Sequence, residues 1–386
     1  MAKDLEIISR GTEEVISPEE LKEKLNRRKP LRVKFGADPT APDIHLGHTV
    51  ILQKLKQFQD LGHKIVFIIG DFTARIGDPS GRSEARKPLT DEEIKKNAKT
   101  YQKQVFKILD KKETEVVFNS EWLERMSSAD VLELSSHSTV AQMLARADFK
   151  ERFNREIDIS ILEFLYPLLQ AYDSIQVKAD VEIGGTDQKF NLLMGRQLQR
   201  DFDQKPQVII TMPLLEGTDG VRKMSKSYDN YIGITEPPKE IFGKIMSISD
   251  ELMVKYYELL TEENLEEVKK MHPRQAKANL AKGIVETYYG ETEAEKAKGE
   301  FEKVFVKREL PEEIKEIRIR EKKIWVVDLL VKSGLAISKN EAKRLISQGS
   351  VKINHKRIKD SDMDLVIDKE YIVQVGKRKF RRIVQA

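Results

Sequence analysis

The feature that most constrains the fold is a pair of strand-like runs near the N-terminus with one helical stretch between them. Residues 31–37 are extended in character, a turn-rich loop with Pro39 and Pro42 follows, and a helix is expected from about Ile44. The second run, 64–70, is apolar after its first residue and ends in glycine, which is typical of a buried parallel strand. Two parallel strands joined through a helix form a right-handed βαβ unit. The sequence therefore predicts an α/β core built on a parallel sheet.

The same pattern returns later in the chain. Strand-like runs at 180–185 and 207–211 flank a helical stretch at about 189–199, so the sheet is expected to be doubly wound and Rossmann-like. A part rich in Glu and Lys follows without any strand signal, and the last segment has two helical pieces and then short strands. The sequence predicts a Rossmann-like domain over 1–235 with a helical insertion at about 90–165, an all-helical domain over 236–310, a charged linker over 311–322 and a small α+β domain over 323–386.

The composition excludes several kinds of site. The 386 residues include no cysteine, which excludes disulfides, thiolate zinc sites and a cysteine nucleophile; no metal site is predicted. No apolar run reaches the roughly 18 residues of a membrane span, and the first residues lack the apolar core of a signal peptide. We therefore expect a cytoplasmic protein with no membrane partner.

Charge is distributed unevenly along the chain. The net charge is only +4, but residues 323–386 contain 15 Lys and Arg against 7 Asp and Glu, a net charge of +8, which leaves −4 on residues 1–322. A basic terminal domain on an acidic body indicates a polyanionic partner.

Two histidines stand at the predicted start of the first long helix. His45 and His48 are three residues apart, so they project from one face of the first turn. Backbone N–H groups without helical partners and the positive end of the helix dipole favour a phosphate at that place. A histidine pair that merely fills the surface or the core is the alternative.

A lysine pair stands at the far end of the predicted sheet. The stretch 223–227 reads Lys-Met-Ser-Lys-Ser between glycine-containing turns. A solvated basic loop would look the same, but two ammonium groups on a mobile loop also suit a triphosphate from which pyrophosphate leaves. A His-x-Gly-His early in a nucleotide-binding sheet and Lys-Met-Ser-Lys-Ser at its end, in this order, resemble the paired signatures of class I aminoacyl-tRNA synthetases.

The middle of the chain carries three polar side chains at helical spacing. Tyr166, Gln170 and Asp173 lie at i, i+4 and i+7, one face of a helix, although an amphipathic helix with incidental polar residues fits too. Pro167 suits a first helical turn, which would place Tyr166 at the cap. With GDPSGR at 77–82 and GGTDQ at 184–188, these residues resemble the tyrosyl-tRNA synthetase family, in its second bacterial branch, over nearly the whole chain.

The resemblance implies roles for individual residues. Asp173 would accept a hydrogen bond from the phenol of tyrosine, and Lys34 replaces a tyrosine that also contacts this phenol in the better-studied branch. Asp78, Tyr166 and Gln170 would hold the α-ammonium group. The implied catalytic residues are Thr40, His45, His48, Lys223 and Lys226; the ATP-binding residues are Gly36, Asp38, Gly47, His48, Gly185, Asp187 and Lys226; the tyrosine-binding residues are Lys34, Asp78, Tyr166, Gln170, Asp173 and Gln188.

The basic tail resembles the small RNA-binding domain named for ribosomal protein S4. Cations around a turn at Gly349 would contact phosphates, although a solvated charged surface is the alternative. The implied RNA-binding residues are Lys343, Arg344, Lys352, Lys356 and Arg357.

The resemblance also implies substrates and partners. These are tyrosine, ATP with Mg²⁺ as a substrate, tRNA(Tyr) and a second copy of the chain in a homodimer. Two rival interpretations remain. A tryptophanyl enzyme would share the sheet and the signatures, and a non-catalytic RNA-binding protein could be built on the same scaffold.

Overall fold

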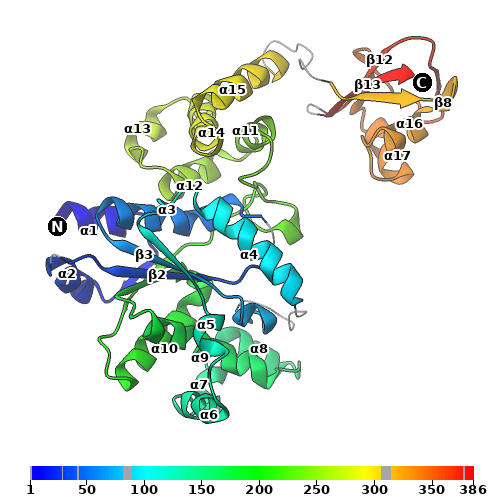
Figure 1. Ribbon diagram of the computed structural model, residues 1–386. Helices are drawn as coiled ribbons and strands as arrows, with labels where there is room; N and C mark the ends of the chain where they lie inside the picture. The colour runs from blue at the N-terminus through cyan, green and yellow to red at the C-terminus, as the bar shows by residue number, and fades with distance from the viewer. Residues whose placement is uncertain (1, 28, 41–42, 81–88, 306–313, 377–378) are drawn as a thin grey trace. The chain divides into compact units, whose positions relative to one another are not determined.

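The chain forms two compact units, Met1–Glu295 and Lys296–Ala386, and each is described by itself (Figure 1). The computed structural model describes residues 2–27, 29–40, 43–80, 89–305, 314–376 and 379–386. The predicted division into four domains stays a prediction, apart from the helical insertion and the linker, which are corrected below.

A six-stranded sheet is the centre of the first unit and confirms the predicted α/β core. Its strand order is β1-β6-β5-β2-β3-β4, and the pairs from β6 to β4 are all parallel. The edge strand β1 runs antiparallel to β6; it was not predicted, because three residues are too short to show a period. The strands are β1 (Glu14–Ile16), β2 (Arg32–Ala37), β3 (Lys64–Ile69), β4 (Thr114–Phe118), β5 (Val181–Gly185) and β6 (Val208–Met212).

The strand order reverses between β2 and β5. From β2 the chain proceeds outward through β3 and β4 on one side, and from β5 to β6 on the other. The ladder between β2 and β5 has only two register pairs, Val33 with Val181 and Lys34 with Glu182. In open α/β sheets, ligands bind beyond the carboxyl ends of the strands at such a switch point. The site is therefore expected where β2 and β5 end.

Helices cover both faces of this sheet. Figure 1 shows α3 and α4 on one side and α9 and α10 on the other. The helices up to α10 are α1 (Ala2–Ser9), α2 (Pro18–Asn26), α3 (Leu46–Asp60), α4 (Asp91–Val105), α5 (Ser120–Leu123), α6 (Ser128–Ser136), α7 (Val140–Leu144), α8 (Ala147–Asn154), α9 (Ile161–Gln176) and α10 (Lys189–Asp201).

The chain after the sheet is helical, as its sequence indicates. Helix α11 packs against α14, and α12 contacts α3 of the sheet region. The helices are α11 (Pro238–Met246), α12 (Asp250–Leu260), α13 (Leu265–Lys270), α14 (Pro273–Tyr289) and α15 (Glu291–Phe305). Among the residues that the structure describes, no helix is both long and apolar enough to cross a bilayer.

Three expectations need correction. The predicted insertion at about 90–165 is shorter, because α4 is the crossover from β3 to β4 and β4 pairs with β3 in the sheet. The predicted linker contains β7 (Glu316–Ile319), which pairs with β13 of the second unit; residues 311–313 lie outside the described part. Pro167 does not begin a helix. Ser160 caps α9 and Glu163 completes a capping box, so the helix starts six residues earlier and Pro167 is internal.

The second unit is a small α+β fold. Its five-stranded sheet has the order β10-β9-β12-β13-β7, beside the β11-β8 pair. Two packed helices complete it, with Leu330, Ile346 and Val373 fully buried in the core. Its elements are β7, β8 (Lys323–Trp325), α16 (Val326–Lys332), α17 (Lys339–Ser347), β9 (Val351–Ile353), β10 (Lys356–Arg357), β11 (Asp364–Val366), β12 (Tyr371–Val375) and β13 (Lys379–Gln385).

Candidate active site

The two histidines lie at the beginning of α3. His45 is the N-cap, with extended φ and ψ of −117° and 168°, and the helix begins at Leu46. The His45 N–H donates to Nδ1 of His48 at 3.3 Å, and the two ring centroids are 3.8 Å apart. Gly47 lies between them, where an added Cβ would come 3.0 Å from the His45 ring. The pair thus forms one compact group at the helix N-terminus.

Both imidazoles are neutral at physiological pH. Burial, reinforced by the His48 and Lys226 charges, lowers the pKa of His45 to about 2. Burial and the Lys226 ammonium lower the pKa of His48 to about 4. Nδ1 of His45 is buried and has no hydrogen-bond partner among the described residues. Neutral rings can donate one N–H each but supply no net charge, so any cationic help for a phosphate has to come from elsewhere.

The loop that carries the lysine pair folds around the side chain of Asn230. Its Oδ1 accepts the Ser225 N–H at 2.8 Å. Its Nδ2 donates to the carbonyls of Arg222 and Lys223 at 3.3 and 3.2 Å and to Asp219 Oδ2 at 3.1 Å. Asn230 is buried and was not identified from the sequence, because its role depends on contacts within an irregular loop.

This loop is attached to the start of α3. The Leu46 N–H donates to the Ile232 carbonyl at 2.9 Å, and the Ile234 N–H donates to the Ile44 carbonyl at 3.1 Å. The Gly47 N–H also donates to Sδ of Met224 at 3.3 Å. The two signature stretches, far apart in sequence, are therefore one structural feature.

Both lysines of the loop are held by carboxylates. Lys226 Nζ lies 2.9 Å from Asp43 Oδ2, and Lys223 Nζ lies 3.5 Å from Asp187 Oδ2. Burial raises the pKa of Asp187, and the Lys223 charge opposes this. The loop thus holds one ammonium group beside Asp187, just after β5, and the other beside Asp43, just before α3.

A cavity of about 240 Å³ lies in that crevice. It is lined by most of the predicted ATP- and tyrosine-binding residues. Lys34, His45, Gly47, Lys223 and Lys226 are not in its lining. The predicted residues that line it are Gly36, Asp38, Thr40, His48, Asp78, Tyr166, Gln170, Asp173, Gly185, Asp187 and Gln188.

The helix α9 presents its three predicted residues to this cavity. Tyr166, Gln170 and Asp173 all line it, so the predicted common face is correct although the predicted cap position of Tyr166 is wrong. The Tyr166 hydroxyl donates to Asp38 Oδ2 at 2.9 Å. Burial and the neighbouring carboxylates of Asp38 and Asp78 raise the pKa of Tyr166, so this hydroxyl remains a hydrogen-bond donor.

Asp173 is a buried carboxylate with two neutral donors. Trp122 Nε1 donates to Oδ1 at 2.8 Å and Asn119 Nδ2 donates to Oδ2 at 3.3 Å. Burial raises the pKa of Asp173 to about 7, whereas Lys34 and the two donors act to lower it. Trp122 and Asn119 were missed, since nothing in the sequence connects them with a helix some fifty residues later.

A second group of polar side chains lies around Asn191. Its Nδ2 donates to Gln170 Oε1 at 3.0 Å and to Gln188 Oε1 at 3.2 Å. Gln188 Nε2 in turn donates to Asp78 Oδ2 at 2.6 Å. Asn191 is almost fully buried and was also missed. Of the GDPSGR stretch, Gly81 and Arg82 lie outside the described residues.

Two glycines allow side chains to approach the backbone closely. An added Cβ at Gly185 would lie 2.6 Å from Asp187 Oδ1, and one at Gly70 would lie 2.1 Å from Asp38 Oδ1. Real Cβ atoms do not come this close to an oxygen, so both positions require glycine while these carboxylates stay in place. Gly185 was predicted, and Gly70 was noted only as the end of a strand.

Lys34 is not placed to touch a ligand in the cavity. Its side chain is completely buried. Its ammonium donates to the Gln170 carbonyl at 3.0 Å and Ser174 Oγ at 2.7 Å, and pairs with Glu182 Oε1 at 2.7 Å. An ammonium group has three N–H donors, and all three are used. The predicted direct contact with tyrosine is therefore corrected: Lys34 lies behind the cavity wall.

The predicted RNA-binding cations lie in the second unit. Lys343 and Arg344 are exposed on α17, Lys352 is half-buried on β9, and Lys356 and Arg357 are exposed on β10. The Arg357 side chain approaches Gly349, where an added Cβ would lie 3.1 Å from Cδ. The Arg357 contact thus brings the β9–β10 hairpin to the turn at Gly349, which follows α17 with Lys343 and Arg344.

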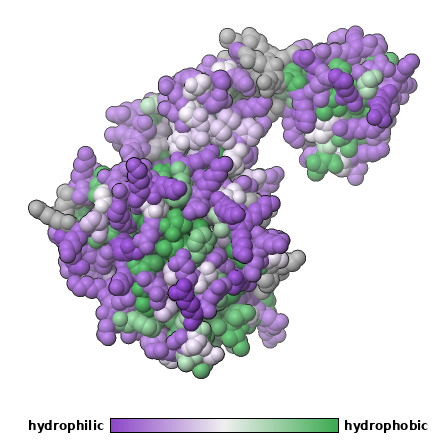
Figure 2. Space-filling model, in the orientation of Figure 1, coloured by the Kyte–Doolittle hydropathy of each residue, from purple (hydrophilic) through white to green (hydrophobic). Residues whose placement is uncertain are grey.

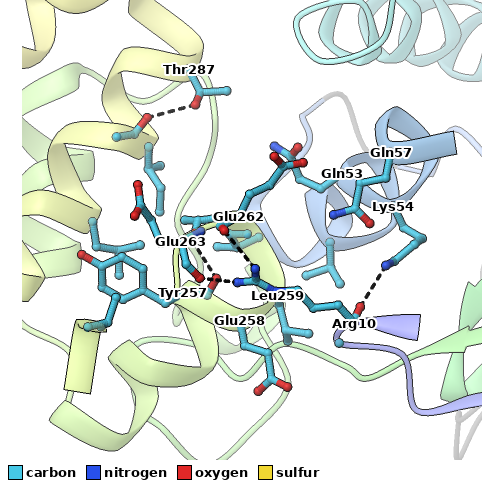
Figure 3. Close-up of a pocket in the computed structure, with 18 of the residues that line it drawn as sticks. Arg10, Gln53, Lys54, Gln57, Tyr257, Glu258, Leu259, Glu262, Glu263 and Thr287 are labelled. Atoms are coloured by element: carbon cyan, nitrogen blue, oxygen red, sulfur yellow. Dashed lines mark hydrogen bonds between the residues drawn. The ribbon is translucent and has the colours of Figure 1, made fainter. Parts of the chain in front are cut away.

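A larger cavity, of about 680 Å³, lies elsewhere in the first unit. Figure 3 shows Gln53, Lys54 and Gln57 of α3 on one side of it and Tyr257 and Thr287 on the other. None of the predicted ATP- or tyrosine-binding residues lines it. Among the described residues there is also no group of three or more His, Asp or Glu side chains placed to hold a metal ion.

Comparison with known proteins agrees with this geometry. A family model described as "tRNA synthetases class I (W and Y)" matches residues 26–306, and an S4 domain model matches residues 324–376. Tyrosine–tRNA ligase of Aquifex aeolicus is 57% identical, over 99% of this chain and 98% of that protein. The Thermotoga maritima enzyme of the same name is 55% identical, over 99% and 97%.

A solved structure extends the comparison to the fold. Tyrosyl-tRNA synthetase of Archaeoglobus fulgidus, complexed with L-tyrosine, has a TM-score of 0.64 at 27% identity and covers 77% of this chain and 99% of its own. The relatives named above are tyrosine enzymes, which favours the tyrosyl interpretation of this chain over the tryptophanyl alternative. On its sheet, its signature loops and these matches, the chain belongs to the tyrosine–tRNA ligase family of class I aminoacyl-tRNA synthetases.

Proposed function

We propose that the cavity beyond β2 and β5 activates tyrosine. A carboxylate oxygen of tyrosine attacks the α-phosphorus of ATP, the bond to the bridging oxygen breaks, and pyrophosphate leaves with tyrosyl adenylate formed. The 3′-terminal ribose hydroxyl of tRNA(Tyr) then takes the tyrosyl group and AMP leaves. The observation that carries this proposal is the buried Asp173 carboxylate in a cavity that is also lined by His48 at the start of α3 and by Asp187, the partner of Lys223.

Asp173 is proposed as the acceptor for the phenol O–H. The carboxylate already accepts from Trp122 and Asn119, so its position is fixed before a ligand arrives. A phenylalanine side chain would leave a buried carboxylate lone pair without its donor, and such unpaired groups are costly. Selection for tyrosine would follow from one hydrogen bond rather than from the size of the cavity.

The α-ammonium group is proposed to lie among Asp78, Tyr166 and Gln170, with Gln188 beside it. The Gln188–Asp78 and Asn191–Gln170 hydrogen bonds orient these oxygens without any help from a ligand. One carboxylate and several amide and hydroxyl oxygens suit an ammonium group, which has three donors and no acceptor.

The phosphates of ATP are proposed to lie between the start of α3 and the lysine loop. Thr40, His45 and His48 would donate from one side, and Lys223 and Lys226 would neutralise charge from the other as pyrophosphate leaves. The orphaned Nδ1 of His45 supports this placement. Lys223 and Lys226 would exchange their present carboxylate partners for phosphate oxygens. Mg²⁺ arrives with ATP as part of the substrate and is bound chiefly by phosphates.

The ribose and base of ATP are proposed to lie along the ends of β2 and β5. Asp187 would accept from the ribose hydroxyls. Glycines at this edge leave room for the nucleotide to approach the backbone closely. The remaining proposed ATP-binding residues are Gly36, Asp38, Gly47 and Gly185.

The second unit is proposed to bind tRNA(Tyr). The S4 model match and the excess of 15 cations over 7 acidic residues in 323–386 support this role for Lys343, Arg344, Lys352, Lys356 and Arg357. Cation–phosphate contacts would fix the RNA in position without reading its sequence. A cytoplasmic location, where tRNA and ATP occur together, is part of the same proposal, as is membership of the second bacterial branch.

A homodimer is proposed as the assembled form. Large apolar side chains are unusually exposed on α6 to α9 of the first unit, and Figure 2 shows apolar surface at its lower end, where these helices lie in Figure 1. Burying such residues against a second copy removes apolar area from water. These residues are Leu132, Val140, Phe153, Ile161 and Leu162.

Tyrosine-dependent exchange of pyrophosphate into ATP tests the proposed chemistry. We expect exchange with tyrosine and none with tryptophan, and Asp173→Ala to lose most of the preference for tyrosine over phenylalanine. Exchange that depends on tryptophan would establish the tryptophanyl alternative. No exchange with any amino acid, in a folded protein that binds tRNA, would establish the non-catalytic one.

A further inference from the structure

The most deeply buried cation next to the tyrosine cavity is Lys34 of β2. It is completely buried, and its register partner on β5, Glu182, is buried as well. A buried ion pair costs desolvation of both charges and is often no more stable than an apolar pair. The pair is therefore better explained by what it holds in place than by its contribution to the stability of the fold.

The Lys34 ammonium ties the sheet to one turn of α9. It binds the carbonyl of Gln170 and the hydroxyl of Ser174, and these two residues flank Asp173 on the helix. Ser174 Oγ also donates to Glu182 Oε2 at 3.1 Å. Three contacts from two strands thus fix the turn that presents both Gln170 and Asp173 to the cavity.

The same contacts place opposite charges near Asp173. The Lys34 ammonium lowers the pKa of Asp173, and the Glu182 carboxylate raises it. Trp122 and Asn119 contribute only neutral donors. The ionisable groups that face Asp173 are Lys34 from β2, Glu182 from β5 and Tyr166 from α9 itself, with Asp38 and Asp78 beyond Tyr166.

We propose that Lys34 is a positioning residue for tyrosine recognition, which fixes the Gln170–Ser174 turn of α9 against β2 and β5 and supplies the positive charge behind Asp173. This inference rests on the proposed role of Asp173 as the acceptor for the phenol. Lys34 acts through α9 and Asp173 and does not touch the substrate. Removing its charge should make Asp173 harder to ionise, whereas removing the Glu182 charge should make it easier.

The test is the pH dependence of kcat/KM for tyrosine in the exchange assay, which reports groups of the free enzyme. We expect the acid limb of the profile to move to higher pH in Lys34→Met, by at least about half a unit. A directly paired charge shifts the pKa of a carboxyl by about one to three units, and the expected shift is smaller because the direct partner of Lys34 is Glu182. In Glu182→Gln the limb should move to lower pH. KM for ATP should change little in either variant.

A second buried lysine provides a matched control. Lys54 of α3 is almost fully buried and donates to the carbonyls of Ile7, Ile8 and Arg10 at 3.0, 2.9 and 2.9 Å; Figure 3 shows the bond to Arg10. It is not in the lining of the tyrosine cavity. Lys54→Met should lower the melting temperature as Lys34→Met does, but leave the acid limb where it is.

Opposite shifts in the two variants support the proposal. An acid limb that stays in place in both, or moves in the same direction in both, overturns it, because a purely structural pair has no reason to act with opposite signs. If Lys34→Met does not fold, Lys34→Gln, which retains one amide donor for the α9 turn, takes its place.

Asp173→Asn separates this inference from the one on which it depends. If the acid limb persists in Asp173→Asn, the assignment of Asp173 is wrong and the limb belongs to another group. If Asp173→Asn abolishes the limb while the Lys34 and Glu182 variants leave it in place, Asp173 is correctly assigned and the role of Lys34 is refuted.

Discussion

Replacing Asn230 with alanine should distort the loop that carries Lys223 and Lys226 and so slow the reaction with ATP. The side chain makes four hydrogen bonds, one to the Ser225 N–H and three to the Arg222 and Lys223 carbonyls and Asp219. These are the contacts that give the loop its shape around both lysines. Alanine makes none of these hydrogen bonds and leaves a gap beside Gly217. The Gly217 backbone packs directly against the Asn230 side chain, since a Cβ added to Gly217 would lie 2.2 Å from Asn230 Cγ.

The size of the effect follows from these contacts. A hydrogen bond contributes about 0.5–1.5 kcal/mol net, and bonds made by one side chain are not additive. We take about 2–3 kcal/mol for the group, and because each 1.36 kcal/mol is a factor of ten in rate, kcat/KM for ATP should fall about 30- to 160-fold. KM for tyrosine should hardly change, since Asn230 is not in the lining of the tyrosine cavity.

Steady-state exchange with each substrate varied in turn measures this effect. Asn264→Ala is the control, because Asn264 caps α13 with one bond to the Glu266 N–H at 2.9 Å and lies outside the proposed site. Asn264→Ala should be slightly less stable than the wild type, and the ratio of its kcat/KM values for ATP and tyrosine should not change. An Asn230→Ala enzyme with wild-type kcat/KM for ATP, or with a clearly raised KM for tyrosine, would refute the reasoning.

Three further predictions concern other parts of the molecule. Burial lowers the pKa of His48 to about 4 from 6.5, so the unfolded chain binds more protons than the folded chain between these pH values, and stability falls as the pH falls through that window. His48→Gln should therefore flatten the dependence of the free energy of unfolding on pH, measured by urea titrations from pH 4 to 7. An unchanged dependence on pH contradicts this prediction. Deleting 314–386, which removes β7 with its sheet, should spare exchange and weaken aminoacylation of tRNA, whereas equal losses would indicate a structural tail. Ile161→Glu, on the exposed apolar surface, should shift sedimentation from dimer to monomer; a monomeric wild type would end the dimer proposal.

The core of this fold could be predicted because its signals are local. The apolar run of β3 and the turn-rich loop before α3 identify a βαβ unit, and the histidines and lysines are short stretches with recognisable chemistry. The residues of β4 were included in the predicted helical insertion and not placed in the sheet, since pairing with β3 depends on residues about fifty positions away. Pro167 was misleading because the stronger start signal, the capping box that begins at Ser160, lies about two turns earlier.

The supporting residues of the site could not be predicted in the same way. Trp122, Asn119 and Asn191 are single polar side chains whose partners lie on other elements. For Lys34 the strand was predicted, but whether its side chain faces a ligand or the underside of α9 depends on which helix covers that face of β2. The alternation of side chains along a strand distinguishes the two faces of a sheet, but it does not show which helix covers each face.

The short ladder between β2 and β5 has a consequence for how the protein acquires activity. The two halves of the sheet meet through two register pairs, and the nearby bond from the Arg32 N–H to Asp180 spans 148 residues of chain. Contacts between residues so far apart in sequence form late in folding, because the entropy cost of closing the intervening loop comes before any stabilisation from the contacts. During synthesis, β2 to β4 can therefore pair with one another before β5 reaches the sheet, and the tyrosine site is complete only when β5 pairs with β2.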